Sequence, residues 1–261
     1  MDVKREISKL QDELVSLRRD FHRHPELGLH EVRTSKIVED YLRNLGLDVR
    51  RCTPTGIIGV LKGNQSGKTV MLRCDIDALP VTEETKLDFI SENDGVMHAC
   101  GHDGHTAMLL IAAKILAQHK DEIKGNVVFL FQPNEEGAGA EDMVKQGALE
   151  NPKPDAVFGL HIWSPVEVGK IGIISGPIMA SSYYFKITVH GKGGHGGAPH
   201  TAINPIVTAG HILNAIDSFN IGSGLDTALQ EKVKSERLKA DLITNVSHDI
   251  KTPLTSIINY V

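Results

Sequence analysis

Ten consecutive residues, MHACGHDGHT at 97–106, combine three histidines, one cysteine and one aspartate. The chain of 261 residues has only 13 histidines and three cysteines, so this segment is enriched in side chains that bind metals or transfer protons. Thiolate and imidazole groups are good ligands for divalent transition metals, and a carboxylate often completes the set. Cys100 and His102 stand where a helix is expected to begin, so both can face one site. The helix dipole is also expected to favour the thiolate form of Cys100.

Further polar residues stand at or just beyond the ends of three apolar runs that are typical of buried strands, at 69–77, 126–132 and 156–161. These residues are Asp75, Asp77, Glu135, Glu136 and His161. Ligands of open α/β sheets bind at the carboxyl ends of the strands, so these side chains are expected to meet the Cys-His pair at one edge of a sheet. One glutamate of the pair can bind a metal while its neighbour moves protons. The sequence therefore predicts a metal site.

Two other interpretations of the cluster remain open. Cys100 could act as a nucleophile with His102 as its base, but this interpretation leaves the glutamate pair and His161 without a role. Single histidines and glutamate pairs are also more often structural or solvent-exposed than functional. We assign His98 and His105 to this class, as loop and helix-cap residues that support the site. The glutamate pair follows an apolar strand and precedes a flexible GAGA segment, which favours a place in the site.

The elements that must position these residues follow from the apolar pattern. Helical spacing occurs at 7–21, 37–45, 106–119 and 203–216, and strand-like runs occur at 56–61, 69–77, 126–132, 156–161 and 183–191. Strands and helices alternate over most of the chain, which predicts an α/β fold with helices covering a sheet. A glycine-rich loop at 191–200 belongs to a second, smaller unit.

The composition excludes several classes of protein. Hydrophobic residues make up 41% and charged residues 23% of the chain, as in ordinary globular proteins. The net charge of −5 provides no basic surface, so we expect no nucleic-acid partner. We find no apolar run that could span a membrane and no apolar core of a signal peptide. The three scattered cysteines do not suggest a disulfide framework, and we expect a cytoplasmic location.

Six motifs, in order along the chain, together resemble one known family. They are FHRHPELGLHE at 21–31, CDIDALP at 74–80, MHACGHDGHTAMLL at 97–110, FQPNEEGAGA at 131–140, GLHIWSP at 159–165 and GKGGHGGAPH at 191–200. This combination resembles the M20 metallopeptidase family over about residues 5–217. More narrowly, it resembles the amidohydrolase branch of that family, with its hippurate hydrolases, N-acyl-amino-acid deacylases and plant auxin-conjugate hydrolases.

The resemblance implies an organisation for the chain. A catalytic α/β domain with a mixed sheet flanked by helices would occupy residues 1–177. The start of a smaller α+β lid domain would occupy 178–218. The cofactors would be divalent metal ions, two per site, with manganese, zinc and similar ions as candidates. The substrate would be a small N-acyl amino acid, hippurate-like or N-acetylated, whose amide bond is hydrolysed.

The resemblance also implies roles for individual residues. The four metal ligands that it implies are Cys100, His102, Glu136 and His161. Glu135 is similar to the glutamate that acts as general base and then as acid toward the leaving amine. His195, in the lid loop, resembles the histidine that stabilises the oxyanion, often across a dimer. Asp77 resembles a carboxylate that orients the site.

Residues 219–261 follow a different pattern. Their apolar spacing predicts one long C-terminal helix, and SHDIKTPLTSI at 247–257 resembles the H-box of a sensor histidine kinase dimerisation domain. His248 matches the phosphoacceptor. The chain would then combine two gene fragments, and two alternative functions follow: a phosphoacceptor or dimerisation scaffold, or an inactive hybrid.

The M20 resemblance stops near residue 217. In the family, a later segment returns to the catalytic domain and carries one more histidine ligand. We therefore expect hydrolysis by this chain to be impaired. The lid fragment and the C-terminal helix are the two candidate surfaces for a homodimer.

Overall fold

The computed structural model describes residues 2–179 and 186–217. The chain divides into two compact units between Ile173 and Ile174, and each unit is described by itself. The helix predicted for 219–261, with His248, lies outside the described residues. Within the part of the chain that is described, no helix is both long and apolar enough to cross a membrane.

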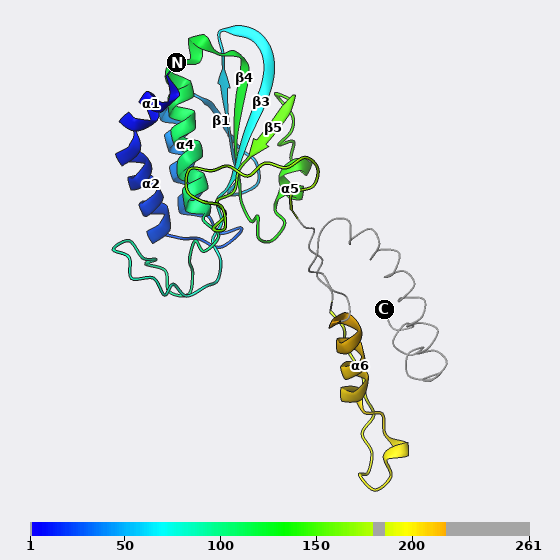
Figure 1. The fold of residues 1–261 in the computed structure, drawn as a ribbon. Helices are drawn as coiled ribbons and strands as arrows, with labels where there is room; N and C mark the ends of the chain where they lie inside the picture. The colour runs from blue at the N-terminus through cyan, green and yellow to red at the C-terminus, as the bar shows by residue number, and fades with distance from the viewer. Residues whose placement is uncertain (1, 180–185, 218–261) are drawn as a thin grey trace. The chain divides into compact units, whose positions relative to one another are not determined.

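The first unit is built on a mixed five-stranded sheet (Figure 1). Its strands are β1 (Asp48–Arg51), β2 (Ile57–Lys62), β3 (Gln65–Asp75), β4 (Lys124–Gln132) and β5 (Ala156–Gly159). They lie in the order β1-β2-β4-β3-β5. The strands β1, β2 and β4 pair in antiparallel fashion, whereas β3 is parallel to both β4 and β5. This arrangement confirms the predicted mixed α/β sheet.

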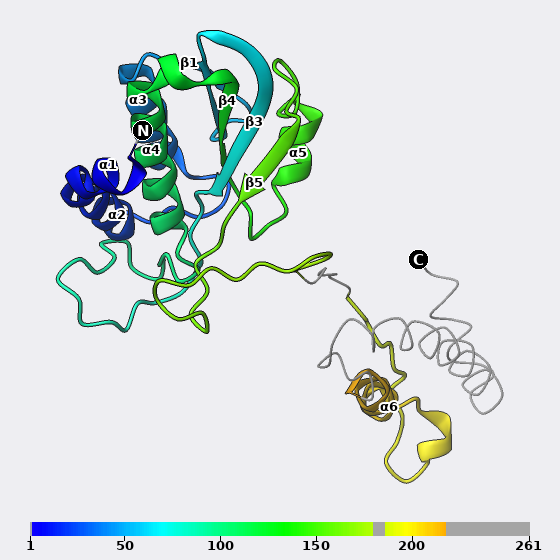
Figure 2. The same cartoon turned by 45° about the horizontal axis from the view of Figure 1, so that its top comes forward.

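Helices cover both faces of this sheet (Figure 2). The helices of the unit are α1 (Val3–Lys9), α2 (Gln11–Arg23), α3 (Val32–Asn44), α4 (His102–Gln118) and α5 (Ala140–Lys145). On one face, α2, α3 and α4 share a core with Phe129 and Phe131 of β4. The alternate residues Val128 and Leu130 point to the other face, where they pack with Met143 of α5. Side chains of a strand alternate between its faces, so β4 serves both cores.

Several predicted elements differ in detail from the structure. The helix predicted over 7–21 is two helices, α1 and α2, because the backbone turns at Leu10 (φ −109°, ψ 9°). The strands and helices predicted over 37–161 are present, with β1 and α5 in addition. β1 escaped prediction because it has only four residues, DVRR, of which three are polar.

The second unit is described for residues 174–179 and 186–217. Helix α6 (Pro205–Asp217) confirms the helix predicted at 203–216. The strand predicted at 183–191 is not present in its described part, 186–191. A strand needs a paired neighbour, and the pairing that the described residues show nearby is a single bridge between Lys192 and Ile203.

Candidate metal centre

The predicted site residues meet at one edge of the sheet. β3 ends at Asp75, β4 ends shortly before Glu135, and β5 ends shortly before His161. These three strands are parallel neighbours, so their carboxyl ends lie at the same edge. Helix α4 begins there with His102, and its Thr106 hydroxyl donates to the backbone oxygen of Asp75 at 3.2 Å. The prediction that separate segments converge on this edge is confirmed.

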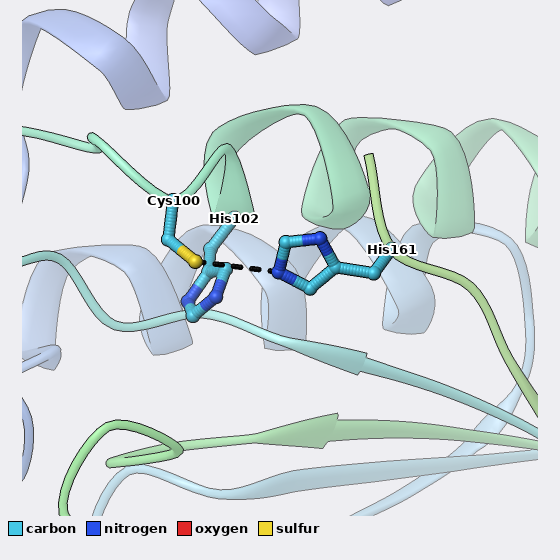
Figure 3. A group of neighbouring side chains, drawn as sticks. All are labelled: Cys100, His102 and His161. Carbon is cyan, nitrogen blue, oxygen red and sulfur yellow. Dashed lines mark hydrogen bonds between the residues drawn. The ribbon is translucent and has the colours of Figure 1, made fainter. Parts of the chain in front are cut away.

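Metal-binding atoms gather around His102. Cys100, His102 and His161 point toward one another, and Cys100 Sγ lies 3.3 Å from His161 Nε2 (Figure 3). Each of the three offers a ligand atom within 4.8 Å of the other two. His102 forms a second group of the same span with Glu135 and Glu136. The four predicted ligands and the predicted base are therefore brought together.

His102 is oriented by its backbone neighbour. Its Nδ1 lies 2.8 Å from the backbone oxygen of Asp77, which can only accept, so Nδ1 carries the hydrogen and donates. Its Nε2 is buried and has no hydrogen-bond partner among the described residues. Burial opposes the charged imidazolium, but the carboxylates of Asp77 and Asp75 outweigh it and raise the pKa of His102. A buried ring nitrogen that has no hydrogen-bond partner and lies near other metal-binding atoms fits the role of a metal ligand.

The electrostatics of the centre also fit a bound cation. Burial and the carboxylates of Glu136 and Glu135 raise the pKa of the Cys100 thiol to about 12. Burial and Asp75 raise the pKa of Glu135. Burial and acidic neighbours outweigh the helix dipole at Cys100, so the helix end alone does not favour the thiolate, whereas a bound cation would favour it. A divalent cation would offset the repulsion among these acidic groups and favour their charged forms.

The nucleophile interpretation of Cys100 finds little support in this geometry. A thiol with so high a pKa is protonated at neutral pH, and the thiolate is the nucleophilic form. The imidazole within hydrogen-bond distance of its sulfur belongs to His161, whereas His102 Nε2 has no such partner in the part of the chain that is described.

Two buried carboxylates brace the loop that carries the glutamate pair. Asp77 Oδ2 accepts from the backbone N–H of Glu136 at 3.0 Å. Glu31 is fully buried, and its two oxygens accept from the N–H of Asn134 and the hydroxyl of Thr55, each at 2.8 Å. No role was predicted for Glu31. Its position as the last residue of the motif at 21–31 was the available signal.

The remaining predicted residues stand apart from this group. His98 is buried, burial lowers its pKa to about 4, and neither ring nitrogen has a hydrogen-bond partner among the described residues. His195 belongs to the second unit, where it is exposed and its Nδ1 accepts from the N–H of Gly197 at 3.0 Å. Its predicted role at the oxyanion stays a prediction.

Comparison with known proteins decides the family. The sequence pattern of the family described as peptidase family M20/M25/M40 matches residues 71–250. The chain belongs to this family. The N-acyl-L-amino acid amidohydrolase of Geobacillus stearothermophilus is 46% identical over 215 residues, which cover 81% of this chain and 58% of that protein. The chain thus spans a little over half the length of this M20 relative.

Solved M20-type structures agree with this membership. The YXEP protein of Bacillus subtilis, a dinuclear metal-binding peptidase of the M20 family, is 41% identical, with a TM-score of 0.62 over 65% of this chain and 48% of that chain. A protein described as an aminohydrolase from methicillin-resistant Staphylococcus aureus is 35% identical, with a TM-score of 0.71 over 86% of this chain and 61% of that chain. These comparisons do not show the kinase resemblance of residues 219–261, which stays a prediction.

Proposed function

We propose that this M20 protein is a metal-dependent amidohydrolase that cleaves the amide bond of N-acyl amino acids. The observation that carries the proposal is the buried Nε2 of His102, which lies amid thiol, imidazole and carboxylate groups and has no hydrogen-bond partner among the described residues. The ligands would be Cys100, His102, Glu136 and His161. The substrate class is supported by the name of the Geobacillus relative, and a pair of metal ions by the dinuclear Bacillus relative.

The chain's own residues would divide the chemistry among them. When bound, a divalent cation supplies Lewis acidity toward the amide carbonyl and the attacking water. Glu135 takes the proton of that water and passes it to the leaving nitrogen. Its raised pKa suits this work, because proton transfer is most effective when the pKa of the group lies near the working pH. His195 would stabilise the oxyanion by hydrogen bonding.

Glu135→Gln separates binding from catalysis. This variant keeps the size of the side chain but cannot accept the proton, so it should retain metal and lose about 10²–10⁴-fold in turnover. The assay measures release of amino acid from N-acetyl amino acids, hippurate and N-acetyldiaminopimelate, with chelator-treated protein as the blank. A variant as active as the parent would refute the general-base role.

The ligand set is tested by metal content. Glu136→Ala and His161→Ala should each lower the amount of metal that remains with the purified protein after dialysis. Glu84→Ala is a matched control, because Glu84 is an exposed glutamate. Metal content that is unchanged in both ligand variants would show that these residues do not bind the metal.

A further inference from the structure

His105 is a buried histidine beside the candidate centre that the proposed chemistry does not use. It lies on α4, one turn after His102, and only 1% of its surface is exposed. Its ring packs against the ring of His161, with centroids 4.7 Å apart and an angle of 68° between the planes. Both of its ring nitrogens have partners. Nδ1 lies 2.6 Å from Asp75 Oδ1, and the backbone N–H of Ile162 donates to Nε2 at 2.9 Å.

These two partners determine which nitrogen carries the hydrogen. A backbone N–H can only donate, so Nε2 of His105 must accept from Ile162 and cannot itself be protonated. Nδ1 then carries the hydrogen and donates to Asp75. Arg73 confirms Asp75 as an acceptor, because its guanidinium donates to the other carboxylate oxygen at 2.7 Å.

The contacts continue into the sheet. Arg73 also donates twice to Oε1 of Gln132, the last residue of β4, at 2.9 and 2.7 Å. A continuous series of hydrogen bonds therefore runs from β4 through β3 and α4 to the segment that follows β5. Among the described residues, the side-chain hydrogen bonds that join residues 160–163 to other parts of the unit are the last bond of this series and the contact between Cys100 and His161.

We propose that His105 is a positioning residue, which holds the backbone at Ile162 and so keeps His161 Nε2 directed at Cys100 and His102. This inference rests on the proposed function, because it takes His161 as a metal ligand. His105 itself does not bind the metal. Asp75, His102 and His105 do form a group whose ligand atoms lie within 4.8 Å of one another. A metal at His105 would, however, have to displace either the Ile162 N–H from Nε2 or the hydrogen that Nδ1 donates to Asp75.

Two substitutions distinguish a positioning residue from a ligand. Glutamine carries an N–H donor and a carbonyl acceptor, so His105→Gln can keep both hydrogen bonds while being a poor metal ligand. His105→Ala removes both bonds. In the 261-residue chain, affinity for Co²⁺ measured by chelator competition should fall about 10–100-fold in His105→Ala and stay close to the parent in His105→Gln. His119→Gln is the matched control, because His119 is the half-buried residue that follows the far end of α4.

Each other outcome has a distinct meaning. Equal loss of affinity in both variants would make His105 a ligand and overturn the inference, as would parental affinity in His105→Ala. His161→Ala serves as the reference for the centre itself. If that variant keeps full affinity, the proposed ligand set fails, whatever His105 does.

A second pair of measurements needs no metal, and the first of the two needs no variant. The ¹⁵N chemical shifts of the His105 ring in metal-free protein should report hydrogen on Nδ1 and an accepting Nε2. Hydrogen exchange at the Ile162 amide should be slow in the parent and in His105→Gln, and faster in His105→Ala. Hydrogen on Nε2 in the parent would overturn the inference even if His105→Ala failed to fold.

Discussion

The two histidines of the candidate centre, His102 and His161, are supported in very different ways. His102 is fully buried at the start of α4, and its ring donates a hydrogen bond to the backbone oxygen of Asp77, just after β3. His161 follows β5, in which Phe158 is 59% exposed. We call the region of β3, β4 and α4 the core wall, and β5 with residues 160–163 the edge wall. In the core wall, burial and a backbone hydrogen bond orient His102, whereas the edge wall depends on a few polar contacts to α4 and the residues before it.

The largest expected effect contrasts the two walls directly. Phe131 of β4 is fully buried, so Phe131→Ala should lower the free energy of unfolding by about 3–5 kcal/mol. The same change in the edge wall, Phe158→Ala, should alter it by no more than about 0.5 kcal/mol. Urea denaturation of both variants measures the difference. Equal losses would show that the edge wall is as well packed as the core wall.

Bound metal should reduce the difference in stability between the core wall and the edge wall. A ligand that binds only the folded chain stabilises it by about 2.7 kcal/mol when present at 100 times its Kd. Because the metal would join His161 to His102 and Cys100, we expect it to slow proteolysis near residues 160–163 more than elsewhere in the first unit. Thermal unfolding and limited proteolysis, with and without chelator, test this. An unchanged cleavage pattern would mean that the metal does not bind the edge wall.

A smaller effect is expected at the base of the glutamate loop. Glu31→Ala leaves the N–H of Asn134 and the hydroxyl of Thr55 without their acceptor, which should cost about 1–3 kcal/mol of folding stability. The loop that carries Glu135 should also move, so turnover should fall more than metal affinity. Glu84→Ala should change neither stability nor turnover. Full stability in Glu31→Ala would contradict the bracing role.

The sequence predicted the core wall better than the contacts that brace it. The apolar runs of β2, β3, β4 and α4 mark buried elements. Because ligands bind at the carboxyl ends of strands in such sheets, the predicted metal-binding residues were expected at one edge. The partners of Glu31 and His105 are backbone amides of Asn134 and Ile162, which lie 103 and 57 residues away. A backbone N–H has the same chemistry at every residue, so such a contact leaves no mark in the sequence.

The predictions that disagree with the structure also failed because the deciding feature leaves no clear pattern in the sequence. The helix expected over 7–21 has an unbroken apolar pattern, and the turn at Leu10 does not interrupt that pattern. Helix α5 has only six residues, too few for helical spacing to be recognised. The thiolate expected at Cys100 was inferred from one helix end, whereas burial and neighbouring carboxylates that are distant in sequence raise the pKa of the thiol.

The most direct test of the metal centre is the absorption spectrum of the Co²⁺-loaded protein. Cobalt bound by a thiolate has an intense ligand-to-metal charge-transfer band in the near ultraviolet. We predict this band in the parent, its loss in Cys100→Ser, and its retention in Cys52→Ala, since Cys52 is buried in the other core and lies 3.5 Å from the backbone oxygen of Met143. The same band in Cys100→Ser as in the parent would contradict the assignment of Cys100, and with it the centre proposed here.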